Sequence, residues 1–377
     1  MTRERLEEVT ARSDEAAIPA PSAVLADAGA RLLFVTGTPA SVRGGSGTFV
    51  GISVLRRALE ESGHRVDLLA PDGDAAGMVS RFLFNLHARR AARRARYDAI
   101  VGFDLDGIYV SAPGVPRIAS VKGVIADELR FERGIMRASM RIAARFEAAH
   151  VRRADVVLTT SSYAADRIAV EYGVVRGAIR IVPEPIDLVR WQGALGRVPT
   201  PASDTPGILC VAHLYPRKQV ESLLRAMPLL KTAARLRVVG TGRERTALSA
   251  LARELGLEGR VELLGHVPFD RLVAEYRGAD VFCLPSLQEG FGIVFLEAMA
   301  AGLPVVACQA AAVPEVVADG ECGILVPPQD VPALAFALDR LCGDVALRRR
   351  FGAAGRRRVA RYDAPIVAGR FLEAIGL

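Results

Sequence analysis

Two glutamates, Glu289 and Glu297, are separated by seven residues in an otherwise apolar segment, EGFGIVFLEAMAAGLPVVAC, at residues 289–308. The preceding residues 279–287 (ADVFCLPSL) have the length and composition of a buried strand, and a Gly-Leu-Pro step ends the helical stretch that follows. The pattern predicts a strand-to-helix turn with one acid in the loop and one near the helix start. A helix cap explains one acid there, but a second acid among apolar residues needs a polar partner. We interpret the segment as part of a binding site.

The composition predicts two globular domains in a reducing compartment. The chain has 377 residues, of which 51% are hydrophobic and 24% charged, enough to build two cores of ordinary size. Its five cysteines lie mostly in apolar runs, and their odd number and spacing argue against a disulfide framework and a zinc site. We expect buried thiols, no metal, no permanently bound cofactor and a cytoplasmic location.

The net charge is +7, and arginines gather in two places. One is residues 348–358, and the other is Arg89 to Arg96 (RRAARRAR). No aromatic residues alternate with the arginines, so we expect no nucleic-acid partner. A solvated helix face and a peripheral contact with an anionic membrane both remain open for this cluster. The most apolar stretch is interrupted by Glu297 and Pro304, so we expect no segment that spans a bilayer.

Alternating strand and helix patterns predict a doubly wound α/β chain with parallel sheets. We divide it into a leader (1–30), a first domain (31–185), a linker (186–206), a second domain (207–355) and a C-terminal helix that crosses back to the first domain (356–377). The expected strands are 32–36, 65–70, 99–102, 117–121, 156–159, 179–182, 208–212, 236–239, 261–264, 281–284, 304–307 and 323–326. Ligands of such sheets bind at the carboxyl ends of the strands, so we expect a site in the cleft between the domains.

Two further loops carry chemistry. Residues 43–48 (RGGSGT) follow the first strand, and their glycines let backbone amides approach an anion, although the spacing matches neither a dinucleotide fingerprint nor a P-loop. Residues 211–218 (VAHLYPRK) follow the first strand of the second domain, where basic groups suit a diphosphate. A carboxylate accepts two hydroxyl hydrogen bonds, which suits a sugar diol. Together these features indicate a nucleotide sugar.

The second half of the chain resembles the retaining glycosyltransferases of family 4, which have the GT-B fold of two Rossmann-like domains facing across a cleft. The resemblance covers residues 207–360 and is carried by KQVESLLRAM, LRVVGTGRERTAL, VELLGHV, the E-x7-E segment and VPEVVADGECGILVPPQD. In the first half it is thinner and rests on the glycine loop, SGHRVDLLAPD and RRADVVLTTSSY.

The resemblance implies a role for each matched residue. Glu289 would hold the transferred sugar and Glu297 the ribose, while Lys218 would hold the diphosphate. The implied catalytic residues are Glu289, Lys218 and His213. The implied donor-binding residues are Gly44, Gly45, His213, Lys218, His266, Val267, Glu289, Phe291, Gly292, Ile293 and Glu297.

Three departures from the family pattern bear on catalysis and on the acceptor. The family usually has Arg where this chain has His213, so a permanent charge becomes conditional. A His that often follows the middle strands of the first domain is missing from SVKGVIADELRFERG. The residues left open as its replacement on the acceptor side are Lys122, Asp127, Glu128 and Arg130. Ala310, Ala311 and Ala312 replace the usual glycine pair before Pro314.

The sequence therefore predicts a retaining hexosyltransferase that uses a UDP-sugar first and a GDP-sugar next. The acceptor is left open among a small molecule, a lipid and a polysaccharide. One alternative is a GT-B protein that binds the nucleotide sugar but has impaired catalysis. Another is a nucleotide-dependent oxidoreductase, which the missing dinucleotide fingerprint disfavours.

Overall fold

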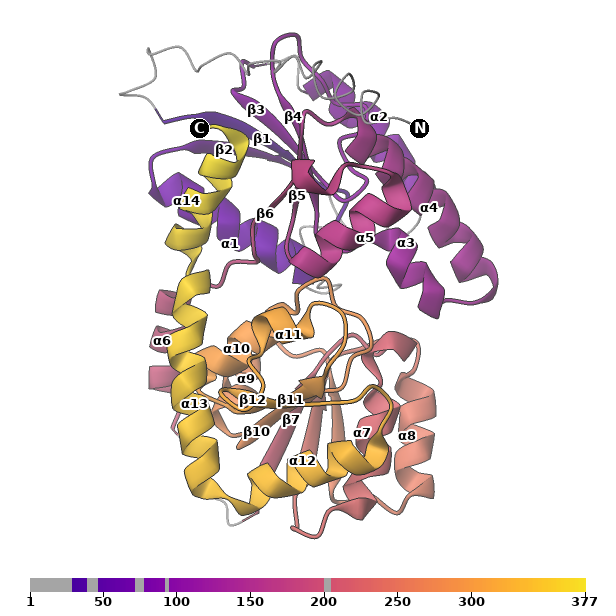
Figure 1. Ribbon diagram of the computed structural model, residues 1–377, viewed down its shortest axis with the longest axis vertical. Coiled ribbons are helices and arrows are strands. Elements are labelled where there is room, and N and C mark those ends of the chain that lie inside the picture. The colour runs from indigo at the N-terminus through magenta and orange to yellow at the C-terminus, as the bar shows by residue number, and fades with distance from the viewer. Residues whose placement is uncertain (1–28, 39–46, 72–77, 92–94, 200–204) are drawn as a thin grey trace, which may run out of the picture.

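The computed structural model describes residues 29–38, 47–71, 78–91, 95–199 and 205–377, and Figure 1 shows two layered units stacked along the long axis. Each unit is built on a six-stranded sheet in which all neighbouring strands are parallel. This confirms the expected two-domain α/β fold, and nearly every strand lies within one residue of its expected bounds.

The first sheet has the order β2-β1-β3-β4-β5-β6. Its strands are β1 (Arg31–Val35), β2 (Arg65–Leu69), β3 (Ala99–Phe103), β4 (Arg117–Val121), β5 (Val156–Thr159) and β6 (Ile179–Ile181). Its helices are α1 (Gly47–Glu61), α2 (Met78–Ala91), α3 (Ile125–Glu128), η3 (Leu129–Phe131), α4 (Gly134–Arg153), α5 (Ser162–Tyr172) and η4 (Arg176–Ala178).

The second sheet has the order β12-β11-β10-β7-β8-β9. The order in which successive strands are added reverses between β7 and β10, while all the strands stay parallel. Its strands are β7 (Gly207–Val211), β8 (Arg235–Val239), β9 (Val261–Gly265), β10 (Val281–Leu284), β11 (Val305–Cys308) and β12 (Gly323–Val326). Its helices are α6 (Leu188–Arg197), η5 (Pro216–Lys218), α7 (Val220–Ala226), η6 (Met227–Leu229), α8 (Arg245–Glu254), α9 (Phe269–Arg277), α10 (Ile293–Ala301), α11 (Val313–Val316), α12 (Val331–Gly343) and α13 (Val345–Val359).

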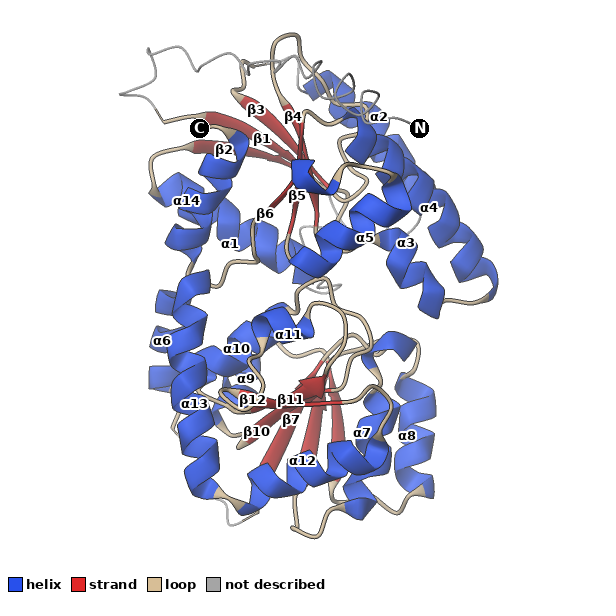
Figure 2. Cartoon of the chain, in the orientation of Figure 1, coloured by secondary structure: helices blue, strands red, loops and turns tan. Residues whose placement is uncertain are grey.

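Helices cover both faces of each sheet, as Figure 2 shows. Successive residues of a strand point to opposite faces. In β1, Phe34 therefore packs with α1 and the C-terminal helix α14 (Ala364–Ile375), whereas Leu33 and Val35 pack on the other face. The second sheet is enclosed in one larger core, which includes all five cysteines as free, buried thiols.

One segment differs from the expected pattern. Residues 186–206 were expected as a linker, yet α6 forms there, because Trp191 packs into the second core. In the first domain, Gly134 begins α4 with a φ of 57°, which interrupts the helical backbone after η3. After α13 packs on α10, the short η7 (Ala360–Tyr362) leads into α14, which lies against α1 of the first domain.

Candidate functional site

The carboxyl ends of the two sheets face each other across a cavity of about 640 Å³. Segments that follow β1, β3, β4 and β6 line it from the first domain, and segments that follow β7 and β10 line it from the second. In the second sheet, β7 and β10 flank the point where the strand order reverses, which is where open parallel sheets bind their ligands.

Lys218 and Glu289 meet in the wall of this cavity. Lys218 ends η5, just after β7, and Glu289 lies in the loop after β10. Lys218 Nζ donates to Glu289 Oε1 at 2.6 Å, and the two side chains are only 12% and 9% exposed. The structure thus places the Lys218 ammonium beside the Glu289 carboxylate, and the roles that the sequence predicts for the two residues stay predictions.

The amino end of α10 opens onto the same cavity. Gly292 has a φ of 89°, and a Cβ there would lie 2.5 Å from the Phe295 ring, so the turn requires glycine. No side chain caps the helix, and residues 291–294 line the cavity. The predicted donors Phe291, Gly292 and Ile293 are thus brought beside Glu289, where unpaired helix amides favour anions and hydroxyl oxygens.

Glu297, the second acid of the pair, does not line the cavity. It lies one helical turn further along α10, where its Oε2 accepts a hydrogen bond from the Tyr276 hydroxyl at 2.7 Å. Burial raises the pKa of Glu297 to about 7, although the hydrogen bond from Tyr276 lowers it in part. Its role as the ribose ligand stays a prediction.

The remaining predicted donor ligands fall into three groups. His213 lines the cavity and stacks on the Tyr215 ring, with centroids 5.6 Å apart. His266 is exposed and Val267 half-buried after β9, and neither lines the cavity. Gly44 and Gly45 lie outside the described residues, while the next residues, Gly47 and Thr48, line the cavity.

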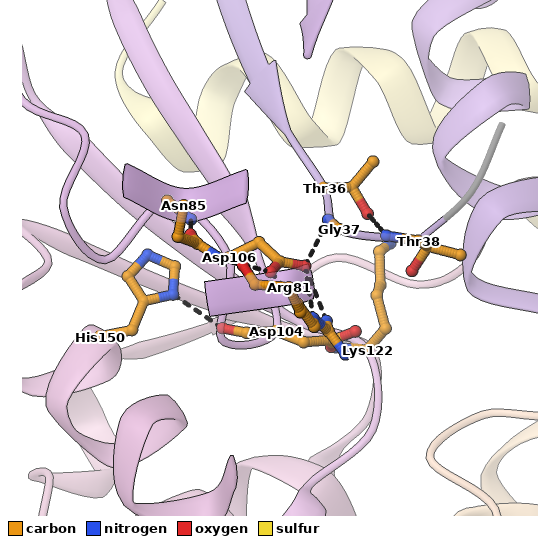
Figure 3. A network of polar contacts seen from close by, with 10 residues as sticks. Thr36, Gly37, Thr38, Arg81, Asn85, Asp104, Asp106, Lys122 and His150 are labelled. Carbon is orange, nitrogen blue, oxygen red and sulfur yellow. Dashed lines mark hydrogen bonds and ion pairs between the residues drawn. The ribbon is translucent and has the colours of Figure 1, made fainter. Parts of the chain in front are cut away.

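The wall of the first domain is fixed by a buried carboxylate, Asp106, shown in Figure 3. Asp106 forms an ion pair with Arg81 at 2.7 Å and accepts hydrogen bonds from the Asn85 amide and from the backbone N–H of Gly37. Arg81 and Asn85 belong to α2, and Gly37 follows β1. The network therefore ties α2 to the end of β1 and holds Arg81 at the cavity.

Asp104 and Lys122 complete this wall. Asp104 has a φ of 55°, and its Oδ1 accepts the backbone N–H of Lys122. Burial raises the pKa of Asp104 to about 6, with Arg81 opposing the shift. Lys122 follows β4 and donates to Glu184 at 3.1 Å in a pair whose side chains are 6% and 8% exposed. Gly51 of α1 leaves room for this carboxylate, since a Cβ there would lie 2.1 Å from Glu184.

The four candidates for the acceptor side separate into two pairs. Lys122 and Glu128 line the cavity. Asp127 instead lies buried, where it binds the Tyr163 hydroxyl and forms ion pairs with Arg130 and Arg167. Arg130 is largely exposed and lies outside the cavity lining.

Part of the first-domain wall is apolar. Helix α4 contributes Met140, Ala143 and Phe146 to the lining, and the segment after β3 contributes Leu105 and Ile108. A purely hydrophilic acceptor would leave these side chains in contact with water, so this part of the cavity favours an acceptor with an apolar portion.

The domains touch directly around the Glu289 loop. The carbonyl oxygen of Gly290 accepts hydrogen bonds from the hydroxyls of Thr160 and Ser161, at the end of β5. Glu315 accepts the backbone N–H groups of Ser162 and Tyr163 at the start of α5. These contacts connect the loop that carries Glu289 to the first domain.

Sequence reasoning missed Arg217, Glu184, Arg81 and Asp104 as cavity residues. Arg217 stood in the predicted basic loop, beside Lys218, and could have been selected on position alone. Glu184 lies between two prolines directly after a strand, IVPEP, which is a weak signal of the same kind. Asp104 directly follows β3 and has the same weak signal, whereas Arg81 depends on its contact with Asp106 from a distant segment, for which the local sequence gives no signal.

No group of three or more His, Cys, Asp or Glu side chains in the described ranges is arranged to hold a metal ion. Within those same ranges, every helix falls short of the length and apolar character that crossing a bilayer requires.

Comparisons with known proteins match both halves of the chain. The family described as "Glycosyltransferase Family 4" matches residues 45–190, and "Glycosyl transferases group 1" matches residues 197–358. The "MMP alpha-(1->4)-mannosyltransferase" of Mycolicibacterium hassiacum is 32% identical over 75% of this chain and 71% of the relative.

A second relative and a solved structure extend this similarity. The "GDP-mannose-dependent alpha-(1-6)-phosphatidylinositol monomannoside mannosyltransferase" of Mycolicibacterium smegmatis is 34% identical over 54% of this chain, and the match spans 57% of that relative. The sucrose-phosphate synthase of Thermosynechococcus elongatus has a TM-score of 0.77 at 23% identity, covering 92% of this chain and 98% of the synthase. At that identity the similarity shows the fold.

Proposed function

This chain belongs to the family 4 glycosyltransferases and has their GT-B fold, and from that premise we propose that it transfers a hexose from a nucleotide-diphosphate sugar to a hydroxyl group, with retention of anomeric configuration. The observation that carries the proposal is the Lys218–Glu289 pair beside the open amino end of α10. A diphosphate and the hydroxyls of its sugar need such a cation, carboxylate and amides within one ligand length.

In the proposed reaction, the bond between the anomeric carbon and the diphosphate breaks, and the acceptor oxygen bonds to that carbon from the same face. Lys218 stabilises the negative charge that develops on the leaving diphosphate. The acceptor's proton passes to the leaving diphosphate oxygen, so the step needs no side-chain base. The sugar is oriented by Glu289 and the amides of residues 291–293, and no metal takes part.

For the donor, we propose that GDP-mannose be tested first, ahead of the UDP-sugar that the sequence analysis preferred. Both mannosyltransferase relatives support a mannosyl donor, and one is named as dependent on GDP-mannose. The protein should be incubated with GDP-mannose, UDP-glucose and native cell extract as the source of acceptors, and products identified by mass spectrometry. A thermal shift with GDP or UDP but no product would favour the non-catalytic binding protein, whereas no shift with either would contradict the proposal.

For the acceptor, we propose an amphiphilic molecule, such as a lipid bearing a hydroxylated head group. The apolar lining from α4 supports this, and so do the exposed side chains of the same helix and of its N-cap. They include four arginines together with Ile135 and Ile142. The arginines are Arg133, Arg137, Arg141 and Arg145.

Exposed basic and apolar side chains on one helix suit a peripheral contact with an anionic membrane. On α2, Arg89 and Arg90 are also exposed, although residues 92–94 of that cluster lie outside the described residues. Sedimentation with vesicles of phosphatidylglycerol, compared with vesicles of phosphatidylcholine, tests the contact. Binding only to the anionic vesicles is expected. Equal absence of binding to both would leave a soluble amphiphile as the acceptor.

A further inference from the structure

Arg217 reaches across the cavity to a carboxylate of the opposite domain. It lies in η5 beside Lys218, and its Nη2 is 3.2 Å from Oε1 of Glu128, at the end of α3. Both side chains line the cavity and are mostly buried, at 16% and 22% exposure. The pair therefore joins the two walls of the cavity.

The guanidinium of Arg217 is not fully used by this contact. Its Nε is buried and has no hydrogen-bond partner among the described residues. A guanidinium presents its donors as a planar fork that matches phosphate oxygens, and a buried donor without a partner is costly. A phosphate oxygen that reached Nε would accept a hydrogen bond from this donor.

Arg217 and His213 both contact the ring of Tyr215. The guanidinium carbon of Arg217 lies 5.7 Å from the centroid of Tyr215, and the imidazole of His213 stacks on the same ring. The charge of an imidazole depends on pH, whereas a guanidinium is charged at every working pH. Arg217 supplies a permanent positive charge in the same cluster.

The cations that line the cavity from the described residues each face a carboxylate, but the four carboxylates are not held equally. Asp106 is fully buried, and Glu184 and Glu289 are less than a tenth exposed, whereas Glu128 is 22% exposed. The Arg217–Glu128 distance is also the longest of the four pairs. Glu128 is thus the carboxylate that an incoming anion displaces most easily.

We propose that Arg217 is a second cationic ligand of the donor's diphosphate, beside Lys218, and that Glu128 occupies it until the diphosphate displaces that carboxylate. The inference rests on the proposed nucleotide-sugar donor. It assigns Glu128 to competition with the donor, in place of the acceptor-side role that the sequence analysis left open. The displaced carboxylate moves toward solvent, and no covalent bond changes.

Calorimetric titration with GDP and UDP tests this inference on the full chain. Glu128→Gln should bind the preferred diphosphate about 3- to 10-fold more tightly, because the competing charge is removed. Arg217→Gln should bind it about 10- to 100-fold more weakly, since a charged hydrogen bond is lost. In the double variant, the gain from Glu128→Gln should disappear, because its effect acts only through Arg217.

Two controls separate this effect from general changes of charge or stability. Arg225→Gln removes an exposed arginine that pairs with Glu221 on α7, outside the cavity, and should leave diphosphate binding unchanged. Guanosine and uridine, which have no phosphate, should bind every variant as they bind the wild type. Circular dichroism confirms that each variant is folded.

The outcomes distinguish this inference from the proposed function. If the wild type binds neither GDP nor UDP, the proposed function fails first. If the wild type binds one of them and Glu128→Gln binds it equally or more weakly, Glu128 does not compete and the inference is overturned. Unchanged binding by Arg217→Gln would overturn it as well.

Discussion

The Tyr276 hydroxyl donates a hydrogen bond to the Glu297 carboxylate at 2.7 Å, and both side chains are buried against the core of the second domain. The second acid of the E-x7-E segment therefore has a protein partner in the unliganded chain. Because burial raises its pKa to about 7, Glu297 retains a proton that the unfolded chain would release near pH 4.5. The folded state binds more protons than the unfolded state between these two values.

Replacing Glu297 by Gln should therefore flatten the pH dependence of stability between about pH 4.5 and pH 7. In the wild type, the contribution of this group is fully present below the lower value and is lost as pH rises through the upper one, by up to about 3 kcal/mol. Urea unfolding at several pH values measures it, as the difference between wild type and Glu297→Gln. Parallel curves for the two proteins would show that Glu297 titrates normally.

Replacing Lys218 by Met should lower both the turnover and the stability of the protein, for two different physical reasons. Turnover should fall by about 10²- to 10³-fold, because charge on the leaving diphosphate loses its partner. Stability should fall by about 3–5 kcal/mol, because Glu289 is left as an unpaired, largely buried charge.

A double variant, Lys218→Met with Glu289→Gln, tells the two routes apart. It leaves no unpaired charge, so urea unfolding should show most of the stability restored, whereas steady-state kinetics should show that activity remains lost. Recovery of activity in the double variant would contradict the role of Lys218.

The elements and the turn around Glu289 could be predicted because their signals are local. Strand bounds follow from short apolar runs between turn residues, and α10 ends at Gly302 in the left-handed conformation that the Gly-Leu-Pro step indicates. The α6 helix was missed because its stability comes from Trp191, which packs with Phe269 and Tyr276 of α9, and proline-rich flanks masked this.

The site was predicted less completely, because its second half arises only when the domains meet. Glu128 is an ordinary acid in α3 until Arg217 of the other domain lies beside it. In the same way, Thr160 and Ser161 follow a strand in the sequence, and only the fold shows that both hydroxyls bind the Gly290 carbonyl.

One of the alanines that replace the family's glycine pair, Ala311, has a strained backbone conformation. Ala311 has a φ of 50°, in the left-handed region that disfavours a Cβ. Ala311→Gly should relieve this strain and stabilise the protein by about 1 kcal/mol, the net of strain relief and added entropy of the unfolded chain. Thermal unfolding measures the change. Ala138→Gly, at an exposed position within α4, is the matched control and should destabilise by about 1 kcal/mol.

The two domains approach each other closely at Gly290. A Cβ on this residue would lie 2.4 Å from the carbonyl oxygen of Lys122, and that backbone is fixed at the end of β4. Gly290→Ala should therefore hold the domains apart and displace the Glu289 loop. Because displacements of about 1 Å cost about 10²-fold in rate, turnover should fall by at least that factor. Small-angle X-ray scattering should show a larger radius of gyration, while circular dichroism remains that of a folded protein.

The matched control for this change is Gly369→Ala, in the middle of α14, where a Cβ would meet no atom within 4 Å. It should leave turnover and the radius of gyration unchanged and raise stability by up to about 1 kcal/mol, because alanine favours the helix. If Gly290→Ala matched this control in both turnover and radius, the contact between Gly290 and Lys122 would not belong to the catalytic arrangement. The position of Glu289 in the cavity would then depend on other contacts between the two domains.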